Sequence, residues 1–124
     1  MELKVLKCNV CGNMVTFLRE SGAPMSCCGQ NMNVVVPGTV DASLEKHVPV
    51  YKVEGDIVTV TVGAVEHPML PEHYIQWIAI QTKNGIQIKE LKPGEKPEAC
   101  FALCCGDEVV AVYEYCNLHS LWKA

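Results

Sequence analysis

Four cysteines within the first 28 residues constrain this chain more than any other feature of its sequence. They are Cys8 and Cys11 in "CNVCG" and Cys27 and Cys28 in "CCG". Two cysteines separated by two residues, with a glycine just after, form a tight knuckle that points both sulfurs at one ion. A second pair completes four thiolates, which suits zinc or a single iron. The spacing predicts a metal site without distinguishing the two metals.

The adjacent pair Cys27–Cys28 adds a geometric condition. Neighbouring side chains on an extended chain point to opposite sides. Both thiolates can bind one ion only if the backbone bends sharply, so we expect a distorted tetrahedron. A piece of fewer than about forty residues is too small to bury a core of its own. We therefore expect the metal to hold this piece together.

The whole chain has eight cysteines in 124 residues, and its N-terminus "MELKVLKCNV" lacks the apolar core of a signal peptide. We expect a cytoplasmic protein, because clustered cysteines in a reducing compartment more often bind metal than form disulfides. A secreted protein with a disulfide framework is the alternative. The net charge of −4, without a cluster of Lys and Arg, argues against nucleic-acid binding. No apolar run approaches bilayer length, so no membrane span is expected.

Beyond the cysteine-rich piece, about residues 1–37, the sequence predicts β structure. Val36–Ser43, "VPGTVDAS", is typical of a linker because it combines Pro, Gly and small polar residues. In Ile57–Val62, three valines at period two would share one face of a strand. Asn84-Gly85 is the strongest hairpin signal, since both residues tolerate positive φ.

No window has a sustained helical stripe, and at most a short turn of helix fits near "PEHY". "KPGE", Lys92–Glu95, marks another turn. Many short strands with glycine turns predict an immunoglobulin-type β-sandwich or a small barrel.

The four histidines all lie outside the N-terminal piece, and the last of them is three residues from a cysteine: His47, His67, His73 and His119, with Cys116. If all five converge, they exceed the four ligands of a structural zinc site. Five ligands with an open sixth position suit iron that binds a small molecule, and the thiolate would donate electron density to it. If only two histidines converge with Cys116 and Met69, the site would resemble a blue-copper centre. Unlinked surface histidines are the remaining alternative.

Several short motifs match one family in their order along the chain. They are "CNVCG…CCG", "EKHVPV", "HPM", "HYIQW", "LKPGEKPEA" and "YCNLHSLWK". Through them the chain closely resembles the desulfoferrodoxins, the two-iron form of superoxide reductase, over nearly its whole length. "EKHVP" and "YCNLH" are rarely found together elsewhere, so the resemblance is specific.

The resemblance implies an all-β protein with two domains and two mononuclear iron sites. Residues 1–37 would form a desulforedoxin-like domain whose first iron is held by Cys8, Cys11, Cys27 and Cys28. Residues 38–124 would form the catalytic domain, an immunoglobulin-like β-sandwich. In this domain the ligands of the second iron would be His47, His67, His73 and His119 in the equatorial plane and Cys116 on the axis.

The resemblance also implies an activity, the reduction of superoxide to hydrogen peroxide without release of dioxygen. Glu45 would occupy the open sixth position in the oxidised state. Lys46 would attract the anionic substrate and help to protonate the bound peroxide through water. Members of the family are typically homodimers, and a rubredoxin-like protein would donate the electrons.

Two other functions stay open. One is a non-catalytic iron electron-transfer protein whose working centre is the four-thiolate site. The other is a zinc-stabilised binding module. Only the reductase gives the four histidines and Cys116 a joint purpose.

One segment departs from the family pattern. "ACFALCCG" adds Cys100, Cys104 and Cys105. In a strand, Cys100 and Cys104 would share a face and Cys105 would take the other. We expect small buried residues near a turn, and a redox pair or an extra metal site is the alternative.

Overall fold

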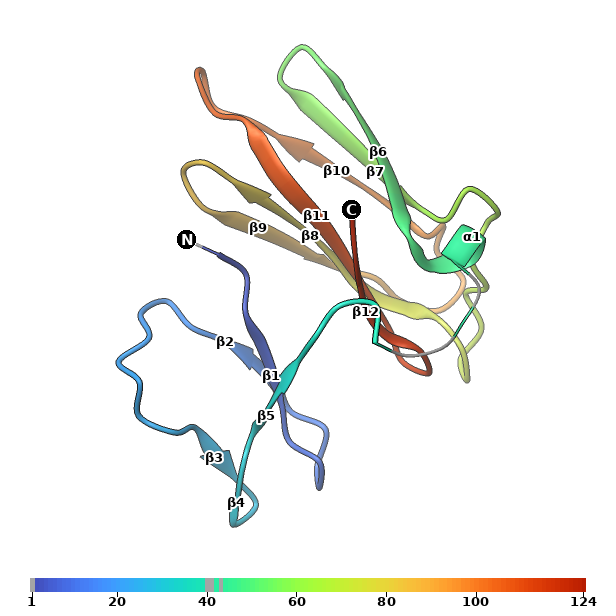
Figure 1. Cartoon of the computed structure of the whole chain (residues 1–124). Coiled ribbons are helices and arrows are strands. Elements are labelled where there is room, and N and C mark those ends of the chain that lie inside the picture. Colours follow the sequence, from blue (N-terminus) through green and yellow to red (C-terminus); the bar gives the residue numbers. More distant parts are fainter. Residues whose placement is uncertain (1, 40–41, 43) are drawn as a thin grey trace. The chain divides into compact units, whose positions relative to one another are not determined.

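The computed structural model describes residues 2–39, 42 and 44–124, apart from the side chain of Glu45. Val40, Asp41 and Ser43 of the expected linker therefore lie outside the described residues. Contacts divide the chain into two compact units, Glu2–Val36 and Pro37–Ala124. Nearly all regular structure is β strand (Figure 1), which confirms the all-β prediction. Within the described residues, no helix is long and apolar enough to span a membrane.

The unit Glu2–Val36 contains two small antiparallel sheets. The first has the order β2 (Met14–Thr16), β1 (Val5–Lys7) and β5 (Asn33–Val35), and the second pairs β3 (Ser26–Cys27) with β4 (Gln30–Asn31). Its buried cluster consists of Leu6, Cys8 and Met32, with Val15 and Phe17 packed against it. Such a cluster is small for an independent core, and one of its three buried members is itself a predicted metal ligand.

The unit Pro37–Ala124 is a sandwich of two antiparallel sheets. One has the order β10 (Glu98–Ala102), β7 (Ile57–Val62) and β6 (Pro49–Glu54). The other has the order β12 (Ser120–Lys123), β11 (Val109–Cys116), β8 (Ile75–Thr82) and β9 (Ile86–Glu90). The predicted sandwich is confirmed.

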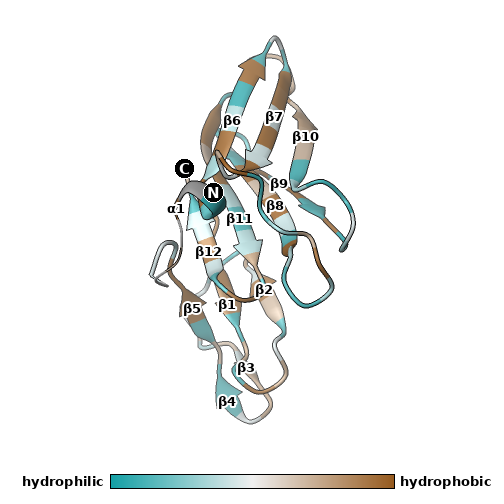
Figure 2. Cartoon of the chain, turned by 90° about the vertical axis from the view of Figure 1, so that its right-hand side faces the viewer, coloured by the Kyte–Doolittle hydropathy of each residue, from teal (hydrophilic) through white to brown (hydrophobic). Residues whose placement is uncertain are grey.

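Side chains from both sheets fill the space between them. Val58, Val60 and Val62 of β7 are buried, as their period-two spacing predicts, and hydrophobic residues run along β7 in Figure 2. They cluster with Ile78 and Ile80 of β8 and with further residues of β10 and β11. On both sheets of a sandwich, residues that face inward alternate with residues that face solvent, and the inward residues form the core.

Two backbone carbonyls of the edge strand β10 accept hydrogen bonds from side chains of the other sheet. Gln87 Nε2 on β9 donates to Ala102 O at 2.9 Å, and Lys89 Nζ donates to Cys100 O. Two polar side chains of the facing sheet thus occupy acceptors that another strand would otherwise pair with.

Two local predictions were wrong in detail. The β8–β9 hairpin forms at Asn84-Gly85 as expected, but neither residue has positive φ. Its turn is closed by Thr82 N, which donates to Gly85 O at 2.8 Å, and Asn84 N also donates to Asp107 Oδ1 at 3.2 Å. The short helix is α1 (Leu44–His47), and "PEHY" forms a turn with an isolated bridge between Leu70 and His73.

The three additional cysteines are exposed rather than buried, so that prediction was also wrong. Cys100 lies on the outer face of β10, while Cys104 and Cys105 lie in the loop before β11. The buried positions of this segment belong to Ala99, Phe101 and Leu103.

We expect Ile80→Ala to lower the free energy of unfolding by about 2–5 kcal/mol, because it leaves a cavity between the two sheets. Ile88 on β9 is 51% exposed, whereas Ile80 is fully buried. Ile88→Ala deletes the same atoms and should cost less than about 1 kcal/mol. Chemical denaturation of both variants with equal metal content measures the difference, and equal losses would contradict the packing described for β8.

Candidate metal centres

The four N-terminal cysteines bring their sulfurs together. Sγ atoms of Cys8, Cys11, Cys27 and Cys28 all lie within 4.8 Å of one another. The Sγ atoms of Cys11 and Cys27 are 3.6 Å apart, and those of Cys27 and Cys28 are 3.8 Å apart. All four are free thiols, so the group offers the four soft donors that zinc or iron takes.

The sharp bend expected at the adjacent pair is present. Cys28 has φ of 52° and Gly29 has φ of 73°, and these two residues form the turn between β3 and β4. The left-handed region is disfavoured for a residue with a Cβ. The turn holds Cys28 there, and its sulfur lies beside that of Cys27.

Backbone N–H groups donate to the first sulfurs, as the knuckle predicts. Val10 N and Cys11 N lie 3.4 and 3.5 Å from Cys8 Sγ, and Asn13 N lies 3.5 Å from Cys11 Sγ. The bonds from Cys11 and Val10 lower the pKa of the Cys8 thiol to about 6. Cys8 is therefore the readiest of these thiols to lose its proton to a metal.

The second group joins five donors from segments far apart in sequence. His47 ends α1, His67 lies between β7 and β8, His73 precedes β8, Cys116 ends β11, and His119 lies in the turn before β12. Their donor atoms all lie within 4.8 Å of one another. The ends of these elements meet at one end of the sandwich (Figure 1).

The four imidazoles form a closed ring. Neighbouring rings in the order His47, His67, His73, His119 and back to His47 have centroids 4.7–5.2 Å apart and stand at 73–84° to each other. His47 Nε2 lies 3.0 Å from His119 Nδ1 and 3.2 Å from His67 Nε2. A ring of nitrogens aimed at one point is the arrangement of an equatorial ligand plane.

This ring rules out two of the sequence alternatives. The histidines are not scattered, and four of them converge rather than the two of a blue-copper site. The sulfur of Met69 accepts a hydrogen bond from Ile75 N at 3.4 Å.

Burial keeps the ring nitrogens available as ligands. It lowers the pKa of His67 to about 4, and it also lowers the pKa of His73. Both imidazoles are neutral at pH 7, the form that binds metal. His67 Nδ1 lies 2.7 Å from Pro68 O, which fixes Nδ1 as the protonated nitrogen and leaves the Nε2 lone pair facing the group.

One orphaned atom tests whether a metal fits here. His73 Nε2 is buried and has no hydrogen-bond partner. A buried polar atom without a partner is costly, and a metal at the centre of the ring would satisfy it. Four imidazoles and one thiol are borderline-soft donors that suit iron, so the residues present fit a mononuclear iron.

The thiol lies on the buried side of the group. Cys116 is fully buried, whereas His73 and His119 are only partly buried. Burial raises the pKa of the Cys116 thiol, and N–H groups of Leu118 and His119 act against that rise. Asn117 N donates to Tyr74 O at 3.2 Å.

The side chain of Asn117 clamps the loop that carries His73, a role that the sequence analysis missed. Its Oδ1 accepts from Tyr74 N at 2.9 Å, and its Nδ2 donates to Glu72 O at 3.0 Å. The two bonds engage the residues on either side of His73. An asparagine directly after a predicted ligand cysteine was the signal that could have suggested a bridging amide.

A buried carboxyl group, Glu114, was also missed. It is fully buried, and neither side-chain oxygen has a hydrogen-bond partner. Burial raises its pKa to about 9, so it is neutral at pH 7. Glu114 lies midway between Val112 and Cys116 on β11, and both of those residues face the core. This period-two spacing could have predicted from the sequence that Glu114 is buried.

The pairing of β11 with β8 changes register next to the thiol. Tyr115 pairs with Trp77, but Cys116 pairs with Ile75, so β8 has one extra residue there. Ile75 consequently faces the core together with Cys116. Bulges of this kind commonly re-aim side chains beside functional sites.

The two predicted catalytic residues lie on α1. Lys46 is exposed, and its charge contributes to lowering the pKa of His73. The backbone of Glu45 is part of α1, but its side chain lies outside the described residues.

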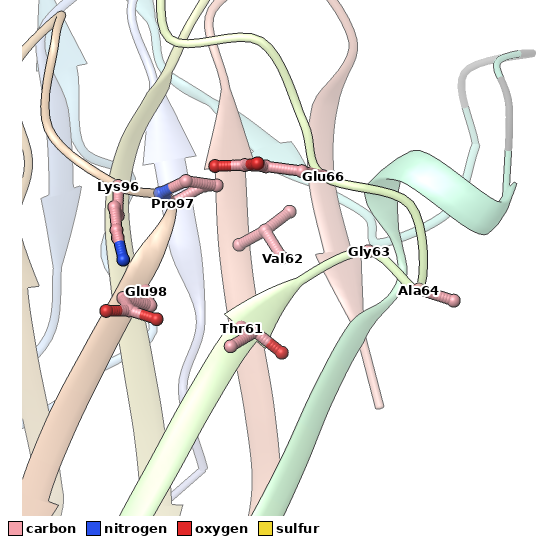
Figure 3. A pocket seen from close by; sticks show the side chains of 8 residues that line it. All are labelled: Thr61, Val62, Gly63, Ala64, Glu66, Lys96, Pro97 and Glu98. Carbon is pink, nitrogen blue, oxygen red and sulfur yellow. The ribbon is translucent and has the colours of Figure 1, made fainter.

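A separate hollow of about 300 Å³ lies beside the loop that carries His67 (Figure 3). The charged side chains that line it are Glu66, Lys96 and Glu98. None of the five donors lines it, so the metal group is distinct from this hollow.

We expect Asn117→Ala to weaken metal retention by the histidine group about 10- to 100-fold, the usual effect of losing an outer partner of a metal ligand. Asn84→Ala makes the same change in the β8–β9 turn and should leave retention unchanged. Competition with a chelator measures both, and equal retention in the two variants would contradict the clamp.

We expect Glu114→Gln to flatten the pH dependence of stability. With a folded pKa near 9 and an unfolded value of 4.5, the folded state keeps a proton that the unfolded chain releases. The contribution of Glu114 to the free energy of unfolding is therefore fully present below pH 4.5 and is lost as the pH rises toward 9. Between pH 5.5 and 8 the loss is at most about 3 kcal/mol.

Denaturation of wild type and Glu114→Gln at both pH values tests this expectation, because metal release adds the same pH dependence to each. The variant should gain on wild type at pH 8. Parallel curves would show that Glu114 is already ionised in the folded protein.

Comparison with known proteins places both donor groups in one family. The family model described as desulfoferrodoxin matches residues 39–124, and the model of the desulfoferrodoxin N-terminal domain matches residues 1–35. A desulfoferrodoxin of Syntrophotalea carbinolica is 46% identical over 123 residues, which cover 99% of this chain and 96% of that protein.

Solved structures agree. The crystal structure of the superoxide reductase from Treponema pallidum has a TM-score of 0.84 and 42% identity, covering 100% of this chain and 99% of that one. A one-iron superoxide reductase from Giardia intestinalis, with a TM-score of 0.55 and 33% identity, covers 64% of this chain and 95% of its own. The four-cysteine group and the group of four histidines and one cysteine are consistent with the two iron sites of a desulfoferrodoxin. The chain belongs to the desulfoferrodoxin family.

Proposed function

We propose that the chain is a superoxide reductase, which converts superoxide, one electron and two protons into hydrogen peroxide without releasing dioxygen. The observation that carries this proposal is the closed ring of four imidazoles with one buried thiol beside it. Five donors would leave room for a small anion on a six-coordinate iron. Two relatives are named superoxide reductases.

The residues of the group have distinct roles in this proposal. His47, His67, His73, His119 and Cys116 would together hold an iron ion, and the thiol of Cys116 is fully buried. Iron bound there would supply one-electron chemistry, and the thiolate would donate electron density to it.

Lys46 is proposed to guide the substrate and to supply protons. Superoxide is an anion and the chain has a net charge of −4, so productive encounter needs local positive potential. Lys46 is exposed, and its charge contributes to lowering the pKa of His73. A proton delivered there through water lets peroxide leave before its O–O bond breaks. We propose Glu45 as the sixth donor in the oxidised state.

The remaining proposals concern organisation and partners. Residues 1–37 would form the domain that holds the first iron, and residues 38–124 the domain that reacts with superoxide. We propose a homodimer in the cytoplasm that receives electrons from a small carrier such as a rubredoxin-like protein.

Rapid mixing with superoxide tests the proposed function. In protein with iron at both sites, the ferrous histidine group should be oxidised in a one-to-one ratio with superoxide and release peroxide without dioxygen. His119→Ala should abolish the reaction, whereas Cys28→Ser, which disrupts the four-thiol site, should preserve it. The opposite pattern would instead identify a non-catalytic electron carrier that works through the thiol site.

We expect Lys46→Ala to slow association with superoxide about tenfold at low ionic strength, because it removes the local positive charge. The difference should shrink as salt is added. Lys83→Ala removes the same charge from the β8–β9 turn and should leave the rate unchanged. The test is to measure the second-order rate constant of the reaction with superoxide as a function of salt concentration for wild type and both variants. Identical salt dependence in all three proteins would show that Lys46 has no part in the mechanism.

A further inference from the structure

The tripeptide Cys-Cys-Gly occurs twice in this chain. The first copy, Cys27–Gly29, supplies two sulfurs of the four-thiol group. The second copy, Cys104–Gly106, lies in the loop between β10 and β11. Neither iron site uses it.

Both copies lie on tight turns that the glycine makes possible. Gly29 has φ of 73° and Gly106 has φ of 84°. In the second copy Asp107 N donates to Cys104 O at 3.0 Å, which closes a turn with Cys105 and Gly106 at its two central positions. A glycine with positive φ at the third position of such a turn is the type II pattern.

The first copy shows what this tripeptide can do. The Sγ atoms of Cys27 and Cys28 lie 3.8 Å apart and belong to one donor group. Adjacent cysteines on a glycine turn can therefore aim both sulfurs at one centre in this chain.

The second turn is held firmly on both sides. Leu103 N donates to Asp56 O at 2.7 Å, and Lys83 N donates to Glu108 O at 3.0 Å. The Oδ1 atom of Asp107 accepts from Asn84 N and from Glu108 N. Two neighbouring loops, between β6 and β7 and between β8 and β9, thus fix the backbone.

The side chains of the pair, in contrast, are exposed. Cys104 and Cys105 both face solvent, and a Cβ placed at Gly106 would meet nothing within 4 Å. The sulfurs can therefore rotate toward each other without displacing neighbours. The loop lies at the opposite end of the sandwich from α1 (Figure 1), so the pair is separate from the histidine group.

We propose that Cys104 and Cys105 form a two-thiolate site for a soft, thiophilic cation of the Cu(I) type. Thiolates are the soft ligands that select Cu(I), and Cu(I) is satisfied by two of them. Zinc is excluded from such a site because it takes four ligands. Binding replaces two S–H bonds by two S–Cu bonds and releases two protons, with no change in oxidation state.

A disulfide between the two is disfavoured by geometry. Consecutive Cα atoms are about 3.8 Å apart, whereas disulfide-linked Cα atoms are usually about 4.4–6.8 Å apart. An ion bridging the two sulfurs spans a longer path than a direct S–S bond and avoids that strain.

The test uses full-length protein with both iron sites filled, kept anaerobic. Cu(I) is offered as a coloured complex with a competing bidentate chelator, and the loss of that colour counts the ions transferred. Wild type should take one Cu(I) per chain while the iron–thiolate absorption of the N-terminal site persists. Cys104→Ser and Cys105→Ser should each take none.

Cys100→Ser is the matched control, because Cys100 is also an exposed thiol on the same segment. It should take one ion, as wild type does. Equal uptake in Cys104→Ser and wild type would overturn the proposal, as would loss of uptake in Cys100→Ser. Uptake that bleaches the iron–thiolate absorption equally in all four proteins would show displacement of iron rather than a separate site.

Discussion

The convergence of four imidazoles and one thiol at one end of the sandwich is the arrangement on which the rest of this structure depends. The donors come from the end of α1, the segment between β7 and β8, the end of β11 and the turn before β12. The segment between β7 and β8 and the end of β11 are joined to strands whose inner faces are buried. A ring of ligands built on strand ends inherits the rigidity of those strands, which a site on free loops would lack.

Burial governs the chemistry of this end of the sandwich. It lowers the pKa of His67 and His73 and raises that of Cys116. The imidazoles are thereby ready to bind a metal, while the thiol must lose a proton to do so. Two features of β11 accompany this site, the register change beside Cys116 and the unpaired carboxyl group of Glu114. Both are departures from an ideal sheet, of the kind that cluster at functional sites.

The two units use metal for different physical purposes. In Glu2–Val36 the buried cluster is small and contains Cys8, so folding and metal binding are coupled there. In Pro37–Ala124 the two sheets bury a core of their own, and the histidine group lies at its end. A metal is thus a structural requirement of the first unit and a reactive centre of the second.

The sequence by itself determined the donor residues, the β character and the family. Ligand spacing such as Cys8–Cys11 and the period-two valines of β7 are local, and local patterns survive in a linear reading. Only the tertiary structure decided that four histidines close a ring, that Asn117 bridges to Glu72 and Tyr74, and that Cys104 and Cys105 are exposed. The Asn84-Gly85 turn also contacts Asp107, more than twenty residues away, which the local hairpin pattern could not show. These features depend on which segments pack against each other, and contacts between distant segments leave no periodic trace in the chain.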